Sequence, residues 1–334
     1  MVVLGLDVGK DSLAACFLLP APSGAITLPA VPNTQAGFKA LLRFAHQHDV
    51  VPADLHVVME ATSVYWEECA TALHEARCTV SVENPAQIKY FARSILRRGK
   101  TDCMDAETIA RYGATRPPKA WHPPDQHSTE LKLLVRERTA LTTTVQQERN
   151  RRHAMEHRST SSPTLLTLVD ERIELLEQQI KAIEAAMKQL LAGHARLEPQ
   201  MRLLLSVPGF GFLSAVSVLA ETDGFSAIET GAQLCAFCGI APSPVQSGTS
   251  VRGRGRISKM GNAHLRRTAY LAALGAAHSH GRLGVFYQHL RLAGKPPKVA
   301  RIALARKLLR VGLAVVKSGQ PYQEDYQRPE HTAA

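Results

Sequence analysis

Four acidic residues stand where carboxylates could do chemistry. Asp7 lies near the end of the apolar run VVLGLDV, and Glu60 ends the run LHVVME. Asp102 and Asp105 lie three residues apart in GKTDCMDAETIA, which places both on one face of an expected helix. Carboxylates tolerate crowding when divalent cations neutralise them, and such hard oxygen ligands select Mg²⁺ or Mn²⁺. The four acids therefore predict a metal site suited to phosphoryl transfer.

Each of these acids also has an ordinary structural explanation. Asp102 could be a helix N-cap, Asp105 a first-turn acid favoured by the helix dipole, and Glu60 a common strand-end carboxylate. Two acids that end buried strands, together with a DxxD pair at a helix start, favour the metal site when taken as a set.

A serine in the stretch VQSGTSVRGRGRISKMGN, residues 245–262, is the second chemical candidate. The composition indicates a flexible basic loop whose arginines, Arg252, Arg254 and Arg256, bind phosphate and developing negative charge. Ser247 could be a nucleophile, but a serine hydroxyl needs activation, and no His or acidic residue lies near it in the sequence. Spacing alone does not exclude Ser250, and a turn hydroxyl without chemistry is the structural alternative.

The distribution of charge points to a polyanionic partner. The chain has a formal net charge of +11, and no Asp or Glu occurs between Glu229 and Glu324, where fifteen Lys and Arg fall. A single-sign block of this length predicts nucleic acid as the partner. The candidate nucleic-acid-binding residues are Lys100, Gly209, Gly211, Arg252, Arg254, Arg256, Lys259, Arg266 and Arg267.

The sequence disfavours a membrane-spanning protein, a secreted protein and a zinc site. No apolar run approaches the ~20 residues needed to span a bilayer, and MVVLGLDVGK reads as a buried strand instead of a signal peptide. We expect a cytoplasmic protein without a membrane partner, associated with the nucleoid when bound to DNA. Cys235 and Cys238 form a lone CxxC, so the six cysteines are expected to be core residues and not zinc ligands.

The elements that must position the acids fall within residues 1–122, the first expected domain. Expected strands cover 2–8, 12–19, 25–31, 55–60 and 78–84, and expected helices cover 35–48, 64–76, 86–98 and 103–114. This mixed α/β order resembles the ribonuclease H-like, or RuvC-like, nuclease fold. If the first and fourth strands are neighbours, Asp7 and Glu60 meet at one sheet edge.

The rest of the chain reads as all-α. Residues 123–195 form an expected domain of two long helices within 126–192, as an antiparallel hairpin or a dimerisation coil. The second carries a coiled-coil seam made of Ile173, Leu176, Ile180, Ile183, Met187 and Leu190. Residues 196–326 form the third expected domain, with helices at 262–277 and 295–312. Its segment 204–221 resembles a helix-hairpin-helix element, whose glycines would let backbone N–H groups approach a DNA phosphate, or else a plain helical hairpin with a glycine turn.

These pieces together resemble a known family, the DEDD transposases of the insertion-sequence family IS110, which are related to Piv-type DNA invertases. The resemblance covers nearly the whole chain. It is carried by the motifs GLDVGK, MEATSVYW, VENPAQIKYFARS, GKTDCMDAETIA, SVPGFG, FCGIAPSPVQSGTSVRGRGRISKMGNAHLRR and VVKSGQPY.

The resemblance implies a site and a reaction. The DEDD acids of a RuvC-like domain fall on Asp7, Glu60, Asp102 and Asp105 and would bind Mg²⁺, with Mn²⁺ as a substitute. A serine of the second domain falls on Ser247 and would attack DNA to form a covalent 5′-phosphoserine. The family uses a structured non-coding bridge RNA, encoded by the element, to choose double-stranded target and donor DNA. Its members form homodimers that assemble into tetramers on DNA, and the acids of one subunit face the serine of another.

Two other functions remain open at this point. A hydrolytic, structure-selective nuclease of the junction-resolvase type would use the four acids and a metal-bound water, without a covalent step. A non-catalytic nucleic-acid-binding regulator would use the basic block alone.

Overall fold

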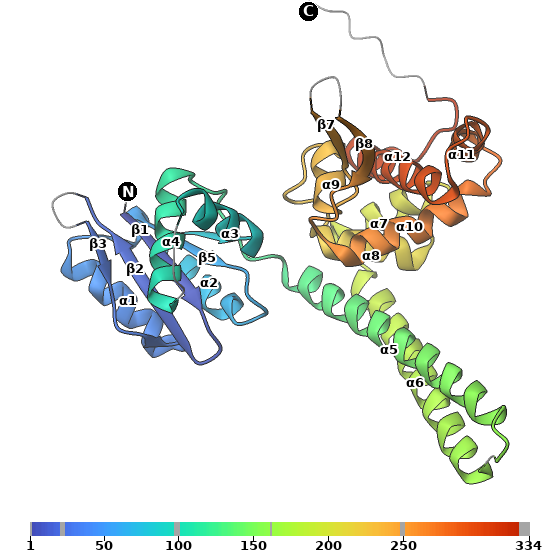
Figure 1. Cartoon of the computed structure of the whole chain (residues 1–334), viewed down its shortest axis with the longest axis horizontal. Helices are drawn as coiled ribbons and strands as arrows, with labels where there is room; N and C mark the ends of the chain where they lie inside the picture. The colour runs from blue at the N-terminus through green and yellow to red at the C-terminus, as the bar shows by residue number, and fades with distance from the viewer. Residues whose placement is uncertain (1, 21–23, 97–100, 161, 248–250, 327–334) are drawn as a thin grey trace, which may run out of the picture. The chain divides into compact units, whose positions relative to one another are not determined.

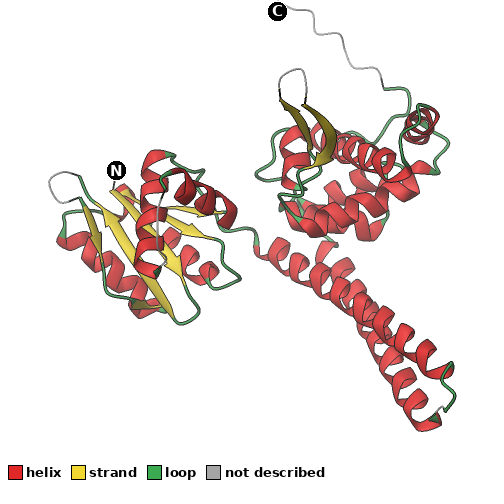
Figure 2. Cartoon of the chain, in the orientation of Figure 1, coloured by secondary structure: helices red, strands yellow, loops and turns green. Residues whose placement is uncertain are grey.

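The structure is a computed structural model and describes residues 2–20, 24–96, 101–160, 162–247 and 251–326; for 244–247 and 251–254 it describes the backbone alone. The chain divides into two compact units, Met1–Pro123 and Pro124–Ala334, which are described one at a time. Figures 1 and 2 show the mixed α/β content of the first unit and the mainly helical content of the second. The expected fold class, α/β followed by all-α, is confirmed, and the three-domain division of the sequence stays a prediction.

The first unit is built on a mixed sheet with the strand order β3-β2-β1-β5-β6, and β4 pairs with β2. The strands are β1 (Val2–Val8), β2 (Ser12–Leu18), β3 (Ala25–Thr27), β4 (Val31–Pro32), β5 (Leu55–Glu60) and β6 (Thr79–Glu83). β1 runs antiparallel to β2 and parallel to β5, and β5 runs parallel to β6. The expected strand 25–31 is two short strands instead of one, and both lie against β2.

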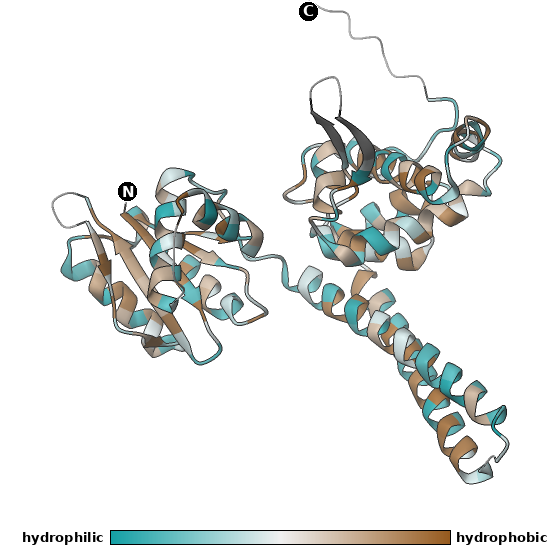
Figure 3. Ribbon diagram, viewed as in Figure 1, coloured by the Kyte–Doolittle hydropathy of each residue, from teal (hydrophilic) through white to brown (hydrophobic). Residues whose placement is uncertain are grey.

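Alternating side chains divide the two faces of this sheet between two sets of helices. One face of β1, with Leu4 and Leu6, packs against α1 (Gln35–Gln47) and α2 (Trp66–Glu75). The other face, with Val3, packs against α3 (Pro85–Ser94) and α4 (Asp102–Thr115). Figure 1 shows α4 crossing this second face, and Figure 3 shows the strands as largely hydrophobic. A sheet covered on both faces explains why its strands read as nearly continuous apolar runs.

The second unit begins with two long helices, α5 (Gln126–Glu156) and α6 (Pro163–Leu191), which pair antiparallel. Ion pairs cross between them, with Arg138 Nε 2.8 Å from Glu184 Oε1 and Arg149 Nη2 2.6 Å from Glu177 Oε1. The expected seam residues of α6 are buried or half-buried, with Met187 fully buried. The structure therefore has the helical hairpin that the sequence left as one of two alternatives.

Six further helices share one core with the near ends of α5 and α6. They are α7 (Leu197–Leu205), α8 (Phe212–Thr222), α9 (Gly231–Phe237), α10 (Ala263–Ala277), α11 (Arg282–Leu292) and α12 (Pro297–Ser318). The cysteines of the CxxC, Cys235 and Cys238, are free and buried in this core, as expected. Burial raises the pKa of the Cys238 thiol to about 12, which keeps it protonated and inert.

The largest departure from the sequence expectation is the basic stretch that was expected as a flexible loop. It contains a β-hairpin of β7 (Pro242–Ser247) and β8 (Val251–Ile257). The run VRGRGRI alternates arginine with small or apolar residues, a period-two pattern that is typical of a strand. The glycines in this run led to the prediction of a loop, because glycine is more common in loops than in strands. Within the described part of the chain, no helix is long and apolar enough to cross a bilayer.

Candidate active site and nucleic-acid interface

Asp7 and Glu60 lie on neighbouring parallel strands at the same edge of the sheet. The register of β1 and β5 runs to Leu6 opposite Met59, so Asp7 and Glu60 are the next residues on the two strands. Both alternate with residues of the α4 face, since Asp7 is four residues after Val3 and Glu60 is two after Val58. The structure therefore brings these two carboxylates to one edge and one face.

A glycine sets how closely α4 approaches that face. A Cβ added at Gly5 would lie 2.2 Å from the carbonyl oxygen of Ala106 and 2.4 Å from the nitrogen of Ala110. Further along the helix, a Cβ at Gly113 would lie 2.6 Å from Val58 and 3.1 Å from Val3. Helix α4 thus runs antiparallel to β1 in near contact with its backbone, and its first turn extends toward the end of β1 that carries Asp7.

Asp102 and Asp105 occupy this first turn. Asp102 is spaced by four and eight residues from Ala106 and Ala110, so it lies on the helix face that packs on the sheet. Asp105 is half-buried and precedes the buried Ile109 by four residues. The N-cap of α4 is Thr101, whose side chain accepts a hydrogen bond of 3.3 Å from the Met104 N–H. The structural explanation of Asp102 as an N-cap is therefore wrong, because Asp102 is already the first helical residue.

A fifth carboxylate at the same edge was missed from the sequence. Glu83 ends β6 and pairs in register with Glu60. Its Oε2 accepts a hydrogen bond of 3.4 Å from the Tyr112 hydroxyl of α4, and burial raises its pKa. The signal was present, since CTVSVE also ends a buried strand on an acid. Glu83 adds a fifth carboxyl group to the edge beside Glu60.

The donor set at this edge fits a hard divalent cation. It consists of carboxylates from a strand pair and a helix start, with oxygen as the ligand atom throughout. Asp7, Glu60, Asp102 and Asp105 could hold such an ion. In the described residues, their ligand atoms do not form a group of three within 4.8 Å, whereas those of Asp125, His127 and His194 do.

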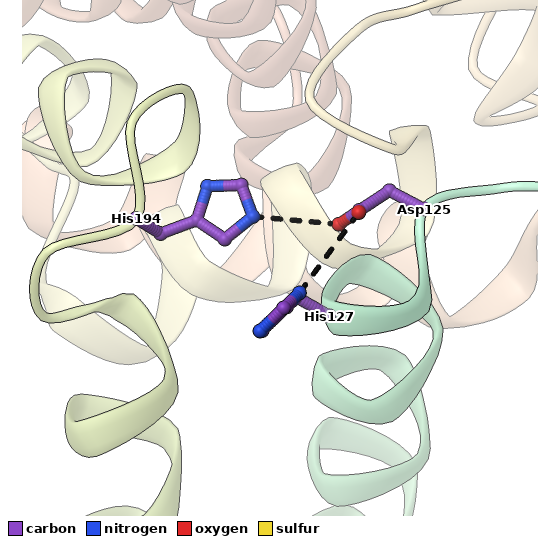
Figure 4. Close-up of side chains that lie close together, drawn as sticks. All are labelled: Asp125, His127 and His194. Carbon is purple, nitrogen blue, oxygen red and sulfur yellow. Dashed lines mark ion pairs between the residues drawn. The ribbon is translucent and has the colours of Figure 1, made fainter.

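This second cluster lies in the helical unit, at the start of α5 and before α7 (Figure 4). Asp125 Oδ2 is 3.4 Å from His194 Nε2, and Asp125 Oδ1 is 3.9 Å from His127 Nδ1. Burial raises the pKa of the Asp125 carboxyl, but the Ser128 N–H and the two histidines outweigh it, so that pKa is lowered overall. Asp125 is the N-cap of α5, which gives the carboxylate a structural role.

Hydrogen bonding at His194 argues against a metal at this cluster. Its Nδ1 accepts from the backbone N–H groups of Arg196 at 3.3 Å and Leu197 at 3.2 Å. A neutral imidazole that accepts at Nδ1 carries its proton on Nε2. The Nε2 that faces Asp125 is therefore a donor and not a free metal ligand. His194 connects the start of α7 to the N-cap of α5.

Ser247 ends β7 and pairs with Val251 of β8, so it stands where the two strands of the hairpin end. We call β7 and β8, residues 242–257, the serine hairpin. Ser250, the competing hydroxyl, and Lys100 lie outside the described residues. Arg252 and Arg254 belong to β8, where the backbone alone is described, and Arg256 is exposed.

The base of the serine hairpin, residues 237–241 and 258–262, is joined by backbone hydrogen bonds. The N–H groups of Ser258, Lys259 and Asn262 donate to Ala241, Gly239 and Phe237, at 3.0, 3.0 and 2.7 Å. One predicted nucleic-acid ligand participates here, because Arg266 Nη1 donates to the carbonyls of Cys238 and Lys259 at 3.2 Å each. The half-buried Arg266 therefore holds the hairpin base, whereas Arg267 and Lys259 are exposed.

The two glycines of the expected helix-hairpin-helix element have different roles. Gly209 has φ +104°, and a Cβ there would lie 2.5 Å from the Cβ of Ala276, so it is required for packing on α10. A Cβ at Gly211 would meet nothing within 4 Å. Its N–H donates to Ser214 Oγ at 2.9 Å, and it caps α8. A cavity of about 500 Å³ borders this turn, with Arg138, Arg267 and His264 in its lining.

Comparisons with known proteins place this chain among the transposases. Residues 4–155 match the DEDD model of the IS110 transposases, described as "Transposase", and residues 201–288 match the "Transposase IS116/IS110/IS902 family". The chain is 29% identical to the pilin gene-inverting protein of Moraxella bovis over 96% of its own length and 97% of that protein. It is 30% identical to a putative transposase of Sinorhizobium fredii over 68% of each chain.

A solved structure of Thermus thermophilus RuvC aligns with 36% of this chain and 99% of that chain, at 18% identity and a TM-score of 0.27, a likeness too weak to support an argument. The family models and relatives define the class: this is a DNA transposase/recombinase. More particularly, the chain belongs to the IS110 family of transposases, with its acids in the first matched segment and Ser247 in the second.

Proposed function

We propose that this chain is a site-specific recombinase of an insertion sequence that cuts and rejoins double-stranded DNA through a covalent serine intermediate. An element-encoded bridge RNA guides it to donor and target. The observation that carries the proposal is the convergence of Asp7, Glu60 and the first turn of α4 on one edge of the sheet. Carboxylates from separate elements meet at one place when a cation is to be bound there.

In this proposal Asp7, Glu60, Asp102 and Asp105 hold Mg²⁺, with Mn²⁺ as a substitute. When bound, the cation would neutralise negative charge that develops on the scissile phosphate. The acids of β1 and β5 stand on paired strands, and those of α4 on a helix seated against Gly5, so their spacing is set before the ion arrives. Sites on rigid elements hold such geometry well.

Ser247 is the proposed nucleophile. Its hydroxyl oxygen forms a bond to phosphorus while the bond from phosphorus to the 3′-oxygen breaks. The serine proton is released, and the departing 3′-oxygen takes up a proton. The 5′-phosphate stays on the enzyme as an ester, and attack by a 3′-hydroxyl of another strand reverses the step. Because the phosphoserine ester conserves the energy of the broken phosphodiester bond, rejoining the strands needs no nucleoside triphosphate. The position of Ser247 at the end of a strand within the basic segment supports this role.

The partners follow from the same proposal. The acid-free block from residue 230 to 323 supplies the cationic surface for donor DNA, target DNA and guide RNA, through residues such as Arg256, Lys259 and Arg267. Homodimers assemble into a tetramer on DNA, in which the acids of one subunit serve the serine of another. An isolated subunit would then be inactive until assembly.

The test combines protein, Mg²⁺, the element's flanking RNA and 3′-labelled DNA, whose label stays on the fragment joined to the serine, followed by denaturation and electrophoresis. We expect a DNA–protein adduct that disappears in Ser247→Ala and persists in Ser250→Ala. Asp7→Asn should reduce adduct formation by about 10²–10³-fold, the scale of losing a group that stabilises charge in the transition state. Asp11→Asn is the matched control, because Asp11 is an exposed acid four residues away in the β1–β2 turn.

Two results would replace the proposal. Cleavage that survives Ser247→Ala but is lost in Asp7→Asn or with a chelator would indicate a hydrolytic nuclease without a covalent step. Nucleic-acid binding without cleavage under any of these conditions would indicate a regulator.

A further inference from the structure

A buried carboxylate joins three elements of the helical unit. Glu221, in the last turn of α8, has a side chain that is 1% exposed. Arg136 of α5 donates to both of its oxygens, from Nε at 2.9 Å and from Nη2 at 3.0 Å. Asn262 Nδ2 donates to Glu221 Oε2 at 2.6 Å. We call Arg136, Glu221 and Asn262 the relay triad.

Asn262 is the member of the triad that touches the serine hairpin's base. Its side-chain oxygen accepts from the Leu265 N–H at 2.9 Å and caps α10. Its own N–H donates to the Phe237 carbonyl at the end of α9. The preceding Gly261, at φ +134°, lies so close to this helix end that a Cβ would be 2.3 Å from the Phe237 oxygen. One side chain thus fixes where the chain leaves β8 and enters α10.

The triad makes more contacts than packing alone would require. A buried ion pair contributes little net stability compared with apolar residues of the same volume, but it imposes a specific geometry. Here several contacts fix the same geometry. Arg136 binds both oxygens of Glu221. Asn262 donates from its amide nitrogen to Glu221 and accepts at its amide oxygen from the start of α10. Breaking one contact leaves a buried polar group without its partner. Such an arrangement suits the positioning of a neighbouring segment.

We propose that the relay triad is a positioning device that fixes the base of the serine hairpin relative to α5. It sets the rate at which Ser247 attacks DNA and leaves nucleic-acid affinity unchanged. This inference rests on the proposed role of Ser247. Arg136, Glu221 and Asn262 do not touch substrate in this account; they act through the backbone of residues 258–262.

The helix that carries Arg136 offers a matched control. Arg138 lies two residues further along α5 and pairs with Glu184 of α6 instead of with Glu221. Arg136→Gln and Arg138→Gln remove the same charge from the same helix, and each breaks an ion pair between elements. A general loss of stability would appear in both variants, whereas a positioning effect appears in Arg136→Gln alone.

The experiment measures three quantities on each full-length variant: the adduct rate at saturating DNA and RNA, the DNA dissociation constant, and amide hydrogen exchange of β7 and β8 without DNA. For Arg136→Gln we expect the adduct rate to fall about 10–100-fold, the scale of misplacing a reactive group by an ångström. We expect the dissociation constant to change by less than about twofold, because Arg136 makes no nucleic-acid contact in this account. Hairpin exchange should become faster. Arg136→Lys, which keeps the charge, should be intermediate.

Equal effects of Arg136→Gln and Arg138→Gln on adduct rate and exchange would overturn the proposal. So would an unchanged adduct rate at saturating DNA together with a raised DNA dissociation constant in Arg136→Gln. If the wild-type protein formed no adduct at all, the proposed role of Ser247 would fail. Hydrogen exchange would still decide whether the triad positions the hairpin: faster exchange in Arg136→Gln alone supports it, and unchanged exchange refutes it. If Arg136→Gln does not fold, Asn262→Ser, which keeps a helix-capping oxygen, serves for the same comparison.

Discussion

The carboxylate edge and the serine hairpin are held in place by different physical means. The edge is defined by a continuous ladder, in which β1, β5 and β6 pair in register and α4 presses on Gly5. The serine hairpin has two strands, and its base is held by a few backbone bonds, Arg266 and the relay triad. A two-stranded hairpin is marginally stable unless something supports it. The edge therefore resists displacement, whereas the hairpin depends on its base.

This difference suits the chemistry proposed for each region. A cation site needs ligands whose positions are set before the ion binds, because carboxylates that repel one another must be held by the fold. A nucleophile that acts only after assembly needs a fixed base, and the two strands beyond that base can still adjust to a substrate. The comparison predicts that an added methyl group destabilises the carboxylate edge strongly and the serine hairpin weakly.

Matched glycine substitutions test that prediction most directly, and the largest effect is expected at the edge. Gly5→Ala places a Cβ 2.2 Å from the Ala106 oxygen, so α4 must move away from β1. Overpacking of this kind costs about 1–3 kcal/mol, and here it also displaces Asp102 and Asp105. We expect a lower midpoint of unfolding for the α/β unit and loss of most DNA cleavage, measured by thermal unfolding and the adduct assay.

The control glycine lies in the serine hairpin. A Cβ at Gly255 of β8 would be 4.0 Å from its nearest neighbour, the Ser243 oxygen. Gly255→Ala should therefore change the free energy of unfolding by less than about 0.5 kcal/mol, as for surface substitutions in general. If Gly255→Ala lowered the free energy of unfolding as much as Gly5→Ala, the proposed difference between the closely packed carboxylate edge and the loosely packed serine hairpin would be wrong.

A fall in pH should destabilise the helical unit, which carries the serine hairpin. The expected effect is smaller than that of Gly5→Ala and larger than that of the histidine substitutions below. Burial raises the pKa of Glu221, but the hydrogen bonds from Arg136 and Asn262 and the positive charges of Arg136 and Lys132 together lower it by more, so its folded pKa lies below its usual value. A lowered pKa contributes stability that is present above the unfolded pKa and is lost as pH falls through the folded one. We expect the helical unit to lose stability progressively below about pH 4.5, the ordinary range of a glutamate.

The measurement for this prediction is the unfolding midpoint of wild type and Glu221→Gln between pH 7 and pH 3. Glutamine cannot titrate, so the variant should be less stable at pH 7 and show a shallower decline toward pH 3. Parallel curves for the two proteins would mean that Glu221 contributes nothing to the acid sensitivity.

How far the sequence sufficed also differs between the two regions. Strand ends and a DxxD helix start are local signals, and they led correctly to β1, β5 and α4. That Asp7 and Glu60 share an edge depended on which strands pair, and the analogy to a known fold supplied that condition. Gly5 also carried a signal, since a glycine inside a buried strand often marks a close approach of backbone, but no partner for it could be named from the sequence.

The helical unit depends on contacts that no local pattern encodes. Arg136 and Glu221 are 85 residues apart, and Asn262 is another 41 residues further on. Arg266 looked like a phosphate ligand because it lies in a basic block, and only the fold shows its guanidinium on two backbone carbonyls. Long-range polar pairs of this kind arise from tertiary packing and not from periodicity, so α9, α11 and the hairpin base could not be deduced.

The smallest effect is expected from substituting the histidines near the start of α5. These substitutions should leave the serine hairpin unchanged. His194→Ala removes the acceptor for the Arg196 and Leu197 N–H groups and the contact with Asp125. Losing a cap of this type costs about 0.5–1 kcal/mol, whereas His127→Ala, which has no capping role, should cost less. Because the described polar partners of the two histidines, Asp125, Arg196 and Leu197, lie outside the relay triad, hydrogen exchange of β7 and β8 should match wild type in both variants. Added Zn²⁺ should not raise the unfolding midpoint, since His194 Nε2 is a donor. Faster hairpin exchange in His194→Ala would show that the start of α5 also governs the hairpin, and the positioning role could then not be confined to the triad.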